Sequence, residues 1–334
     1  MNQSWVYDAL DTLAVLVHKA MLNDIKNYPW FGSHDNLNIT HRVFEQRLSN
    51  QSHFDSGTAG TIFVVKDPST VRLNSRELQA QIALGSKSLI TLEEIYALNS
   101  VAGPRIHQRA VYKVLSILIN SPGFDFESYT LRGDPLFEPL PPVQQLPTGP
   151  NSATTQYMLN TVHIEEASYE GNLRLLEEWF RQLRITSQDE QIKFAIDNVL
   201  IWIGDQLTTS RLRGNQKYRC EDHNSWDCIE YLVKQIGFFH AQMAQEHSIH
   251  EQHYGTSKGR GLAFAFNLLN RRGLSKPSIK GTFHHHLQEG LLHVSEALFH
   301  DLWCVLGRVD SLEKLRLCSP AELYALAERI VLAE

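Results

Sequence analysis

The clearest pattern in the chain is a change from apolar to polar positions at Gly204. Residues 199–203 (VLIWI) are β-branched or aromatic in the main, and Gly204, Asp205 and Gln206 follow them directly. A short apolar run of this kind that ends at a glycine predicts a buried strand. In open α/β sheets the chemistry lies just past the carboxyl ends of the strands. Asp205 is therefore the first candidate for a functional residue.

The remaining pattern predicts many helices and few strands. Apolar residues at helical spacing predict helices over residues 5–27, 75–100, 170–185, 240–254, 262–272, 283–306 and, after the Ser319 capping box, to the C-terminus. Pro104 is expected to open a further helix at its first turn. Residues 30–39 and 57–65 predict strands, and residues 42–48 suit either a strand or a helix. Seven of the twelve prolines lie between residues 121 and 155, which predicts a long irregular connection. We expect an α/β fold with a large insertion.

Composition narrows the class of protein. The 334 residues are 43% hydrophobic and 20% charged, which is typical of a globular protein, and no apolar run is long enough to span a membrane. The first 21 residues lack the basic region of a signal peptide, and four cysteines in a chain of this length favour reduced thiols, so we expect an intracellular protein. The net charge of −6 argues against bulk electrostatic binding to nucleic acid.

The charge is nevertheless uneven along the chain. Residues 205–280 contain 11 Lys and Arg against 7 Asp and Glu. This basic segment is compatible with a phosphate-bearing ligand, although charge alone favours an ordinary solvated surface. The loop at residues 255–261 (GTSKGRG) would suit a phosphate ahead of a helix. It lacks the GK[ST] ending of a P-loop, so a plain loop is the alternative.

Three acids could form a metal site. Two-metal phosphoryl transfer uses carboxylates from separate elements, because Mg²⁺ prefers oxygen ligands. Asp35 and Asp205 each follow an expected strand, and Glu296 lies on an expected late helix, with Glu289 and Asp301 as alternatives. Each acid also has an ordinary interpretation: Asp35 in a turn or cap, Asp205 as the cap of a helix beginning at Gln206, and Glu296 facing solvent.

Histidines and cysteines offer weaker candidates. The helix expected at 240–254 carries four histidines: His240, His247, His250 and His253. The helix expected at 283–306 has His293 and His300 on the same face as Glu296. Neither group has the HExxH spacing of a zinc protease. The Cys220, His223 and Cys228 group supplies only three of the four ligands that a structural zinc needs. We expect no zinc.

The most specific motifs resemble a family. They are residues 203–214 (IGDQLTTSRLRG), residues 237–240 with Met243, His250, residues 254–261, and residues 280–285 with the helix that holds His293, Glu296 and Trp303. These motifs resemble the fungal family called domain of unknown function 6589. Residues 34–38, 45–46 and 57–61 resemble the earlier motifs of that family more loosely. The resemblance extends over residues 30–305.

The family is similar in layout to RNase H-like transposases, and this similarity implies the following expectations. The fold would be an RNase H-like mixed sheet flanked by helices. Its parts would be an N-terminal helix at 1–29, the first strands at 30–66, a helical and Pro-rich insertion at 67–190, the rest of the core at 191–310 and a C-terminal helix at 311–334. Asp35, Asp205 and Glu296 would bind Mg²⁺ or Mn²⁺ for nucleotidyl transfer or nuclease action.

The same resemblance implies DNA as the partner and an intracellular, nuclear location. Four basic residues would contact the phosphates, and two histidines would be accessory: Arg211, Arg213, Lys258 and Arg260, with His240 and His250. The chain lacks a zinc-finger or helix-turn-helix module, so the enzyme could be decayed. A non-catalytic domain of the same fold that binds nucleic acid or protein is the alternative. The sequence sets no oligomeric state.

Overall fold

The computed structural model describes residues 3–41, 53–66, 74–85, 88–145, 147–269 and 285–333. The chain forms two compact units. The first unit combines Met1–Ser88 with Leu146–Ala241, and the second combines Leu89–Gln145 with Gln242–Glu334. None of the helices in the described part of the chain has both the length and the hydropathy that a membrane span requires.

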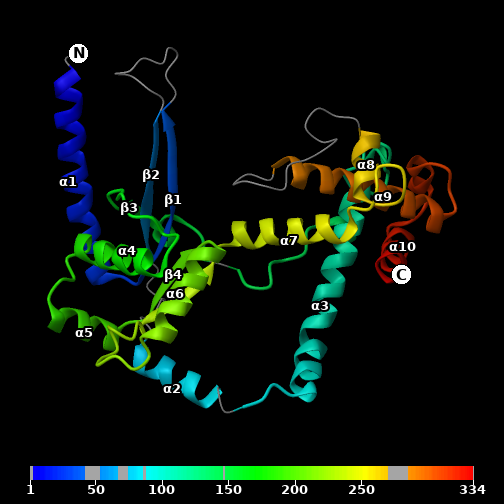
Figure 1. Ribbon diagram of the computed structural model, residues 1–334. Coiled ribbons are helices and arrows are strands. Elements are labelled where there is room, and N and C mark those ends of the chain that lie inside the picture. Colours follow the sequence, from blue (N-terminus) through cyan, green and yellow to red (C-terminus); the bar gives the residue numbers. More distant parts are fainter. Residues whose placement is uncertain are drawn as a thin grey trace. The chain divides into compact units, whose positions relative to one another are not determined.

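The first unit is built on a mixed sheet of five strands in the described residues (Figure 1). The strands are β1 (Trp30–His41), β2 (His53–Val64), β3 (Thr155–Met158), β4 (Leu200–Gly204) and β5 (Leu232–Ile236). Their order across the sheet is β3-β2-β1-β4-β5. β2 is antiparallel to its neighbours β1 and β3, whereas β1, β4 and β5 are parallel. The expected mixed α/β architecture is therefore confirmed, including the strand ahead of Asp205.

Helices of the first unit flank this sheet. They are α1 (Gln3–Asn27), α2 (Ser75–Gly85), α4 (Tyr169–Gln182), α5 (Gln188–Asp197) and α6 (Gln206–Tyr218), and α7 (Phe238–His253) begins here. Side chains fix where several helices begin. Ser168 caps α4, Ser187 and Glu190 form a capping box on α5, and Asp205 caps α6. Each cap satisfies backbone N–H groups that a helix leaves without partners.

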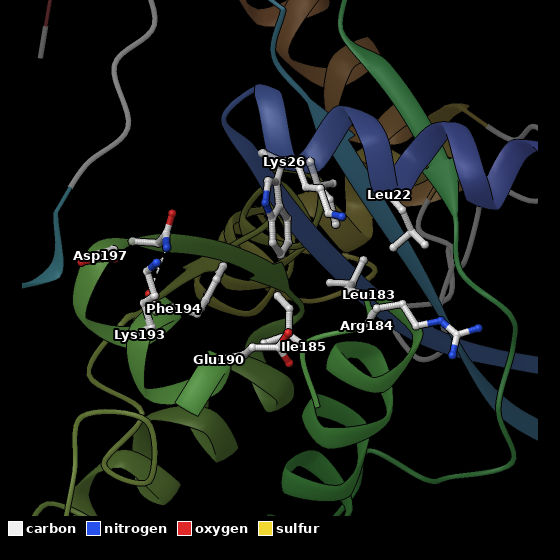
Figure 2. A pocket seen from close by; sticks show the side chains of 12 residues that line it. Leu22, Lys26, Leu183, Arg184, Ile185, Glu190, Lys193, Phe194 and Asp197 are labelled. Atoms are coloured by element: carbon white, nitrogen blue, oxygen red, sulfur yellow. Dashed lines mark hydrogen bonds between the residues drawn. The ribbon is translucent and has the colours of Figure 1, made fainter. Parts of the chain in front are cut away.

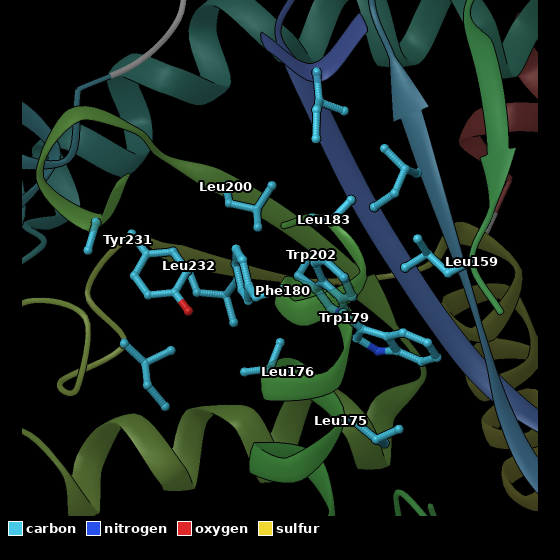
Figure 3. Packing of buried hydrophobic residues seen from close by; sticks show 14 of the residues in the cluster. Leu159, Leu175, Leu176, Trp179, Phe180, Leu183, Leu200, Trp202, Tyr231 and Leu232 are labelled. Carbon is cyan, nitrogen blue, oxygen red and sulfur yellow. The ribbon is translucent and has the colours of Figure 1, made fainter. Parts of the chain in front are cut away.

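Aromatic residues form the centre of the first unit's core. Trp202 on β4 and Trp179 on α4 are almost fully buried, together with Phe180 and Leu200 (Figure 3). The Trp202 ring lies against the backbone of β1 at Gly32, where an added Cβ would come within 2.3 Å of the ring. Gly32 is required by this close approach, because any side chain would displace the indole.

The second unit is helical in its described residues. It contains α3 (Leu92–Ile119), α8 (Leu262–Leu269), α9 (His285–Gly307) and α10 (Pro320–Leu332), with short 3₁₀ turns at Phe126–Ser128, Pro135–Phe137 and Leu312–Leu317. A further 3₁₀ turn, Pro150–Ser152, belongs to the first unit. Its core packs Leu118 and Trp303 with residues of α10. The capping box that starts α10, Ser319 with Glu322, is confirmed.

Two features differ from the sequence expectation. Pro104 lies inside α3 instead of opening a helix, because the capping box of Thr91 and Glu94 starts that helix upstream. The range 67–190, expected as one insertion, is divided between the units: β3 pairs with β2, and α4 belongs to the sheet unit. β3 has only four residues (TQYM) and no alternating β-branched pattern that would have marked it. Residues 42–48 lie outside the described residues.

Candidate functional site

The acid at the end of β4 lies beside an acid on β1. The two strands are adjacent and parallel, with Gly32 opposite Trp202 and Ser33 opposite Ile203. Continuing this register by two residues places Asp35 level with Asp205. Parallel neighbours lie about 4.8 Å apart across a sheet. The backbone therefore places Asp35 and Asp205 near each other, at the carboxyl end of β4.

Asp35 is the more exposed acid of the two. Its side chain is 66% exposed and lies on the opposite face of β1 from the buried His34. Its Oδ1 accepts a hydrogen bond from the Asn36 N–H at 2.8 Å. The Nε2 of His240, at the start of α7, lies 4.0 Å from Asp35 Oδ2. The structure thus brings together Asp35 and the predicted accessory His240.

Asp205 is half-buried and caps α6. Its Oδ1 accepts the Thr208 N–H at 2.6 Å, which confirms the helix-cap interpretation of this residue. The glycine before it makes the turn possible, since an added Cβ on Gly204 would lie 2.6 Å from the Thr208 methyl group. The N-terminus of a helix carries partial positive charge that stabilises a carboxylate. The other carboxylate oxygen, Oδ2, makes no hydrogen bond with the described residues.

A buried histidine lies one residue before Asp35. The Nδ1 of His34 accepts hydrogen bonds from the indole N–H of Trp202 at 2.9 Å and of Trp179 at 3.3 Å. An acceptor Nδ1 leaves the proton on Nε2 in the neutral ring. Burial lowers the pKa of His34 to about 4, so the ring is neutral at physiological pH. Its Nε2 lies 3.4 Å from Glu166 Oε2.

Glu166 is a third acid near the pair. It is fully buried, and its Oε2 accepts the hydroxyl of Thr208 at 3.0 Å, while Oε1 has no hydrogen-bond partner. Burial raises its pKa to about 7; the Thr208 hydrogen bond opposes this shift, and the charges of Asp205 and Asp35 add to it. Thr208 therefore joins Glu166 through its hydroxyl to Asp205 through its backbone.

Helix α6 also contacts the residues that follow Glu166, up to the start of α4. The Arg211 guanidinium lies 4.7 Å from the centre of the Tyr169 ring, and its Nε donates to the Ala167 carbonyl at 3.2 Å. Asn215 donates to the Tyr169 carbonyl at 2.9 Å, and a Cβ on Gly214 would collide with the Tyr169 ring. Arg211, predicted to bind nucleic acid, thus has protein contacts of its own. Arg213 is exposed on the same helix.

Other predicted site residues belong to the second unit. Glu296 lies on α9 with its side chain 55% exposed, and its oxygen is 4.0 Å from His293 Nδ1. The alternative Glu289 lies 3.5 Å from the other nitrogen of the same histidine, and the alternative Asp301 is exposed on α9. His250 is buried against Tyr254 and Phe266, and burial lowers its pKa. These contacts all lie within the second unit.

The loop at residues 255–261 also belongs to the second unit. Its ends are folded by glycines at φ of +63° for Gly255 and +123° for Gly261, a backbone region that glycine adopts without steric cost. Lys258 and Arg260 are exposed in this loop. The backbone closes ahead of α8, where the Ala263 N–H donates to the Tyr254 carbonyl.

The described residues contain no group of three or more His, Cys, Asp and Glu side chains placed to hold a metal ion. This search covers Cys220, His223 and Cys228; the Cys228 thiol donates to the Asp222 carbonyl at 3.3 Å. Two carboxylates can still suffice for Mg²⁺, which commonly takes one or two from the protein and its other ligands from water and substrate phosphates. The hard oxygens of Asp35 and Asp205 fit that type of site.

Comparison with protein families assigns the chain. The model of DUF6589, described as a family of unknown function, matches residues 85–333. The chain belongs to DUF6589. The matched range includes Asp205 and Glu166. Asp35 lies upstream of that range, so the resemblance of residues 34–61 to earlier motifs of the family stays a prediction. No curated protein and no solved structure matches the chain.

The sequence did not single out Glu166 or the chemical role of His34. Glu166 is one of two adjacent glutamates ahead of a helix, and nothing in that pattern distinguishes the buried one from the exposed Glu165. One signal was present for His34: a histidine placed inside a strand, next to an acid. Its burial depends on Trp179 and Trp202, which are distant in the sequence.

Proposed function

We propose that the first unit is an RNase H-like domain that performs divalent-metal-dependent phosphodiester chemistry on DNA. The observation that carries the proposal is the parallel register of β1 and β4, which puts Asp35 level with Asp205. Asp35 and Asp205 belong to neighbouring parallel strands, and α6 and α7 follow β4 and β5. This arrangement agrees with the layout that the resemblance to transposase-derived domains implies.

In this proposal Asp35 and Asp205 would hold Mg²⁺ or Mn²⁺. A bound divalent ion would supply Lewis-acid polarisation of a phosphate and activation of a water molecule. His240, 4.0 Å from Asp35, is placed to orient that carboxylate or to contact a phosphate. Exposed Arg213 adds positive charge on α6, where a DNA backbone near Asp205 would pass.

Glu166 and His34 have a positioning role in this proposal. Glu166 fixes Thr208, and Thr208 fixes the turn that presents Asp205. The His34 Nε2 lies 3.4 Å from Glu166 Oε2 without a hydrogen bond between them. The His34 ring is held by the indole N–H groups of Trp202 and Trp179. A buried network whose members have few alternative partners keeps the carboxylate at β4 in one orientation.

A second candidate is a domain of the same fold that binds without catalysis. The observation that favours it is the absence, in the described residues, of any three acids or histidines placed together for a metal. Asp205 would then serve mainly as the cap of α6. This candidate predicts DNA or protein binding that is independent of Mg²⁺.

The two candidates are separated by an assay of supercoiled-plasmid nicking with Mg²⁺ or Mn²⁺. Asp205→Asn removes the charge but keeps a good helix cap, so the fold is retained. We expect the wild type to nick the plasmid and Asp205→Asn to nick it more slowly by about 100-fold or more. Such a decrease is larger than that expected from removal of a residue that only supports a metal ligand. Asp8→Asn makes the same charge change at an exposed position of α1 and should leave nicking unchanged. Equal nicking by wild type and Asp205→Asn would end the enzymatic proposal.

A further inference from the structure

A cavity lies in the first unit, at the other end of β4 from Asp205. It has a volume of about 570 Å³, within the range of small-molecule sites. Its walls come from the last turns of α1, the start of β1, the loop after α4, and α5 (Figure 2). Asn198 lines it two residues before β4 begins, whereas Asp205 follows the last residue of that strand. The cavity is therefore separate from the acid site.

The floor of the cavity is apolar. Six hydrophobic side chains line it: Leu22, Ile25, Trp30, Leu183, Ile185 and Phe194. The Trp30 and Phe194 rings lie 6.0 Å apart, and both remain partly accessible. Such a lining favours binding of an apolar group, because removing apolar surface from water lowers the free energy.

The rim carries more positive than negative charge. Three cations and two acids line the cavity: Lys26, Arg184 and Lys193, with Glu190 and Asp197. Glu190 already accepts the backbone N–H and the hydroxyl of Ser187, and these hydrogen bonds lower its pKa. Arg184 forms no ion pair or side-chain hydrogen bond with the described residues. A free guanidinium beside an apolar floor is suited to a carboxylate or phosphate group.

The backbone at Arg184 adopts a conformation that is strained for a residue with a side chain. Arg184 has φ of +62°, and it ends α4 in a Schellman motif: its N–H donates to the Arg181 carbonyl, and the Ile185 N–H donates to the Phe180 carbonyl. Glycine is the usual residue at this position because it alone adopts such a φ without steric cost. Glycine at this position would relieve the strain, so Arg184 can be tested by substitution to glycine.

We propose that this cavity binds a small amphipathic organic anion, with its apolar body on the Trp30–Phe194 floor and its carboxylate or phosphate at Arg184. Arg184 selects for the charge, and the six apolar side chains select for the body. The site requires neither Asp35 nor Asp205, so its occupancy is independent of the proposed nuclease function.

The test is an NMR titration of the labelled protein that follows the Trp30 indole N–H, assigned with Trp30→Phe. The probes are octanoate, octyl phosphate and 1-octanol, which share an apolar chain and differ in the head group. We expect octanoate or octyl phosphate to shift the Trp30 signal with saturation. We expect the affinity for 1-octanol to be lower by at least about tenfold. The better of the two anions identifies the head group.

Arg184→Gly is the decisive variant, because it removes the guanidinium and also relieves the backbone strain. Its thermal midpoint should rise while its affinity for the anion falls about tenfold. Arg174→Ala, which removes an exposed arginine of α4 outside the cavity, should leave the affinity unchanged. Absence of any saturable Trp30 shift, equal affinity for 1-octanol, or unchanged affinity in Arg184→Gly would each overturn the proposal.

Discussion

At the scale of the residue, Asp205 has two tasks that one side chain can perform together. One carboxylate oxygen caps α6, and the other is left for a cation or for water. The neighbouring Glu166 contributes differently: it is buried, and it accepts a hydrogen bond from the Thr208 hydroxyl. Substitutions that separate charge from hydrogen bonding can therefore distinguish the structural task of each acid from a functional one.

The capping task of Asp205 predicts a difference between two substitutions. Asp205→Ala removes the acceptor for the Thr208 N–H and should lower the free energy of unfolding by about 1 kcal/mol. Asp205→Asn keeps an acceptor and should change it by only a few tenths of a kcal/mol. Urea unfolding followed by circular dichroism measures both. Equal loss of stability in the two variants would show that the hydrogen bond to Thr208 is not what Asp205 contributes to the fold.

The raised pKa of Glu166 predicts a dependence of stability on pH. The carboxyl holds its proton up to about pH 7 when folded but loses it near pH 4.5 when unfolded. The unfolded state therefore binds fewer protons in this window, and folding becomes less favourable as the pH rises through it. Glu166→Gln cannot ionise and escapes this loss.

The free energy of unfolding of Glu166→Gln, relative to wild type, should thus increase between pH 5 and pH 8. His34 has the opposite effect on both proteins, because its pKa is lowered to about 4 and its contribution to stability is lost as the pH falls below 6.5. Taking the difference between variant and wild type removes the His34 term. A difference that stays constant from pH 5 to pH 8 would contradict the raised pKa of Glu166.

At the scale of the element, the β1–β4 contact positions the two acids. It depends on Gly32, whose backbone the Trp202 ring covers. Gly32→Ala should lower the free energy of unfolding by about 1–3 kcal/mol, because the indole must move away from β1. Gly85→Ala is the matched control, since an added Cβ there meets nothing within 4 Å. Differential scanning calorimetry compares the two. A Gly32→Ala protein as stable as Gly85→Ala would mean that the strand contact tolerates a side chain.

The sequence predicted the elements whose local signals are strong. The unbroken apolar run at residues 199–203 predicted β4, and the capping box of Ser319 and Glu322 predicted α10. β3 was not predicted, because its four residues lack the alternation of apolar and polar positions that indicates a strand. The extension of α3 through Pro104 was missed because the capping box at Thr91 outweighed a proline that the sequence suggested as a helix start.

The site was predictable only in part, for a physical reason. Asp205 was proposed because an acid after a strand has a local pattern, whereas Asp35 lies inside β1 and not after it. The alignment of the two acids comes from strand pairing across the sheet. Glu166 and His34 were missed because burial of a polar side chain depends on residues far along the chain, such as Trp179 and Thr208. The relation of Glu296 to these acids stays a prediction.

At the scale of the molecule, the described residues have separate hydrophobic cores in the two units. One core contains Trp179 and Trp202, and another contains Leu118 and Trp303. Trp303 is the single tryptophan of the second unit, while the other five lie in the first. Units with their own cores can unfold as separate cooperative steps.

Leu118→Ala should therefore destabilise the second unit by about 2–5 kcal/mol through a buried cavity. Labelling with 5-fluorotryptophan gives each indole its own NMR signal during urea unfolding. The Trp303 transition should move to lower urea, and the Trp202 transition should stay within error. If both transitions moved together by the same amount, the chain would unfold as one cooperative body.

Titration with Mn²⁺ decides whether Asp35 and Asp205 together bind a divalent cation. Electron paramagnetic resonance of free Mn²⁺ gives the dissociation constant for wild type, Asp35→Asn, Asp205→Asn and the control Asp8→Asn. We predict saturable binding by the wild type and by Asp8→Asn, and at least about tenfold weaker binding when either site acid loses its charge. Wild-type affinity in Asp35→Asn, or no saturable binding by the wild type, would contradict binding of the cation by both acids.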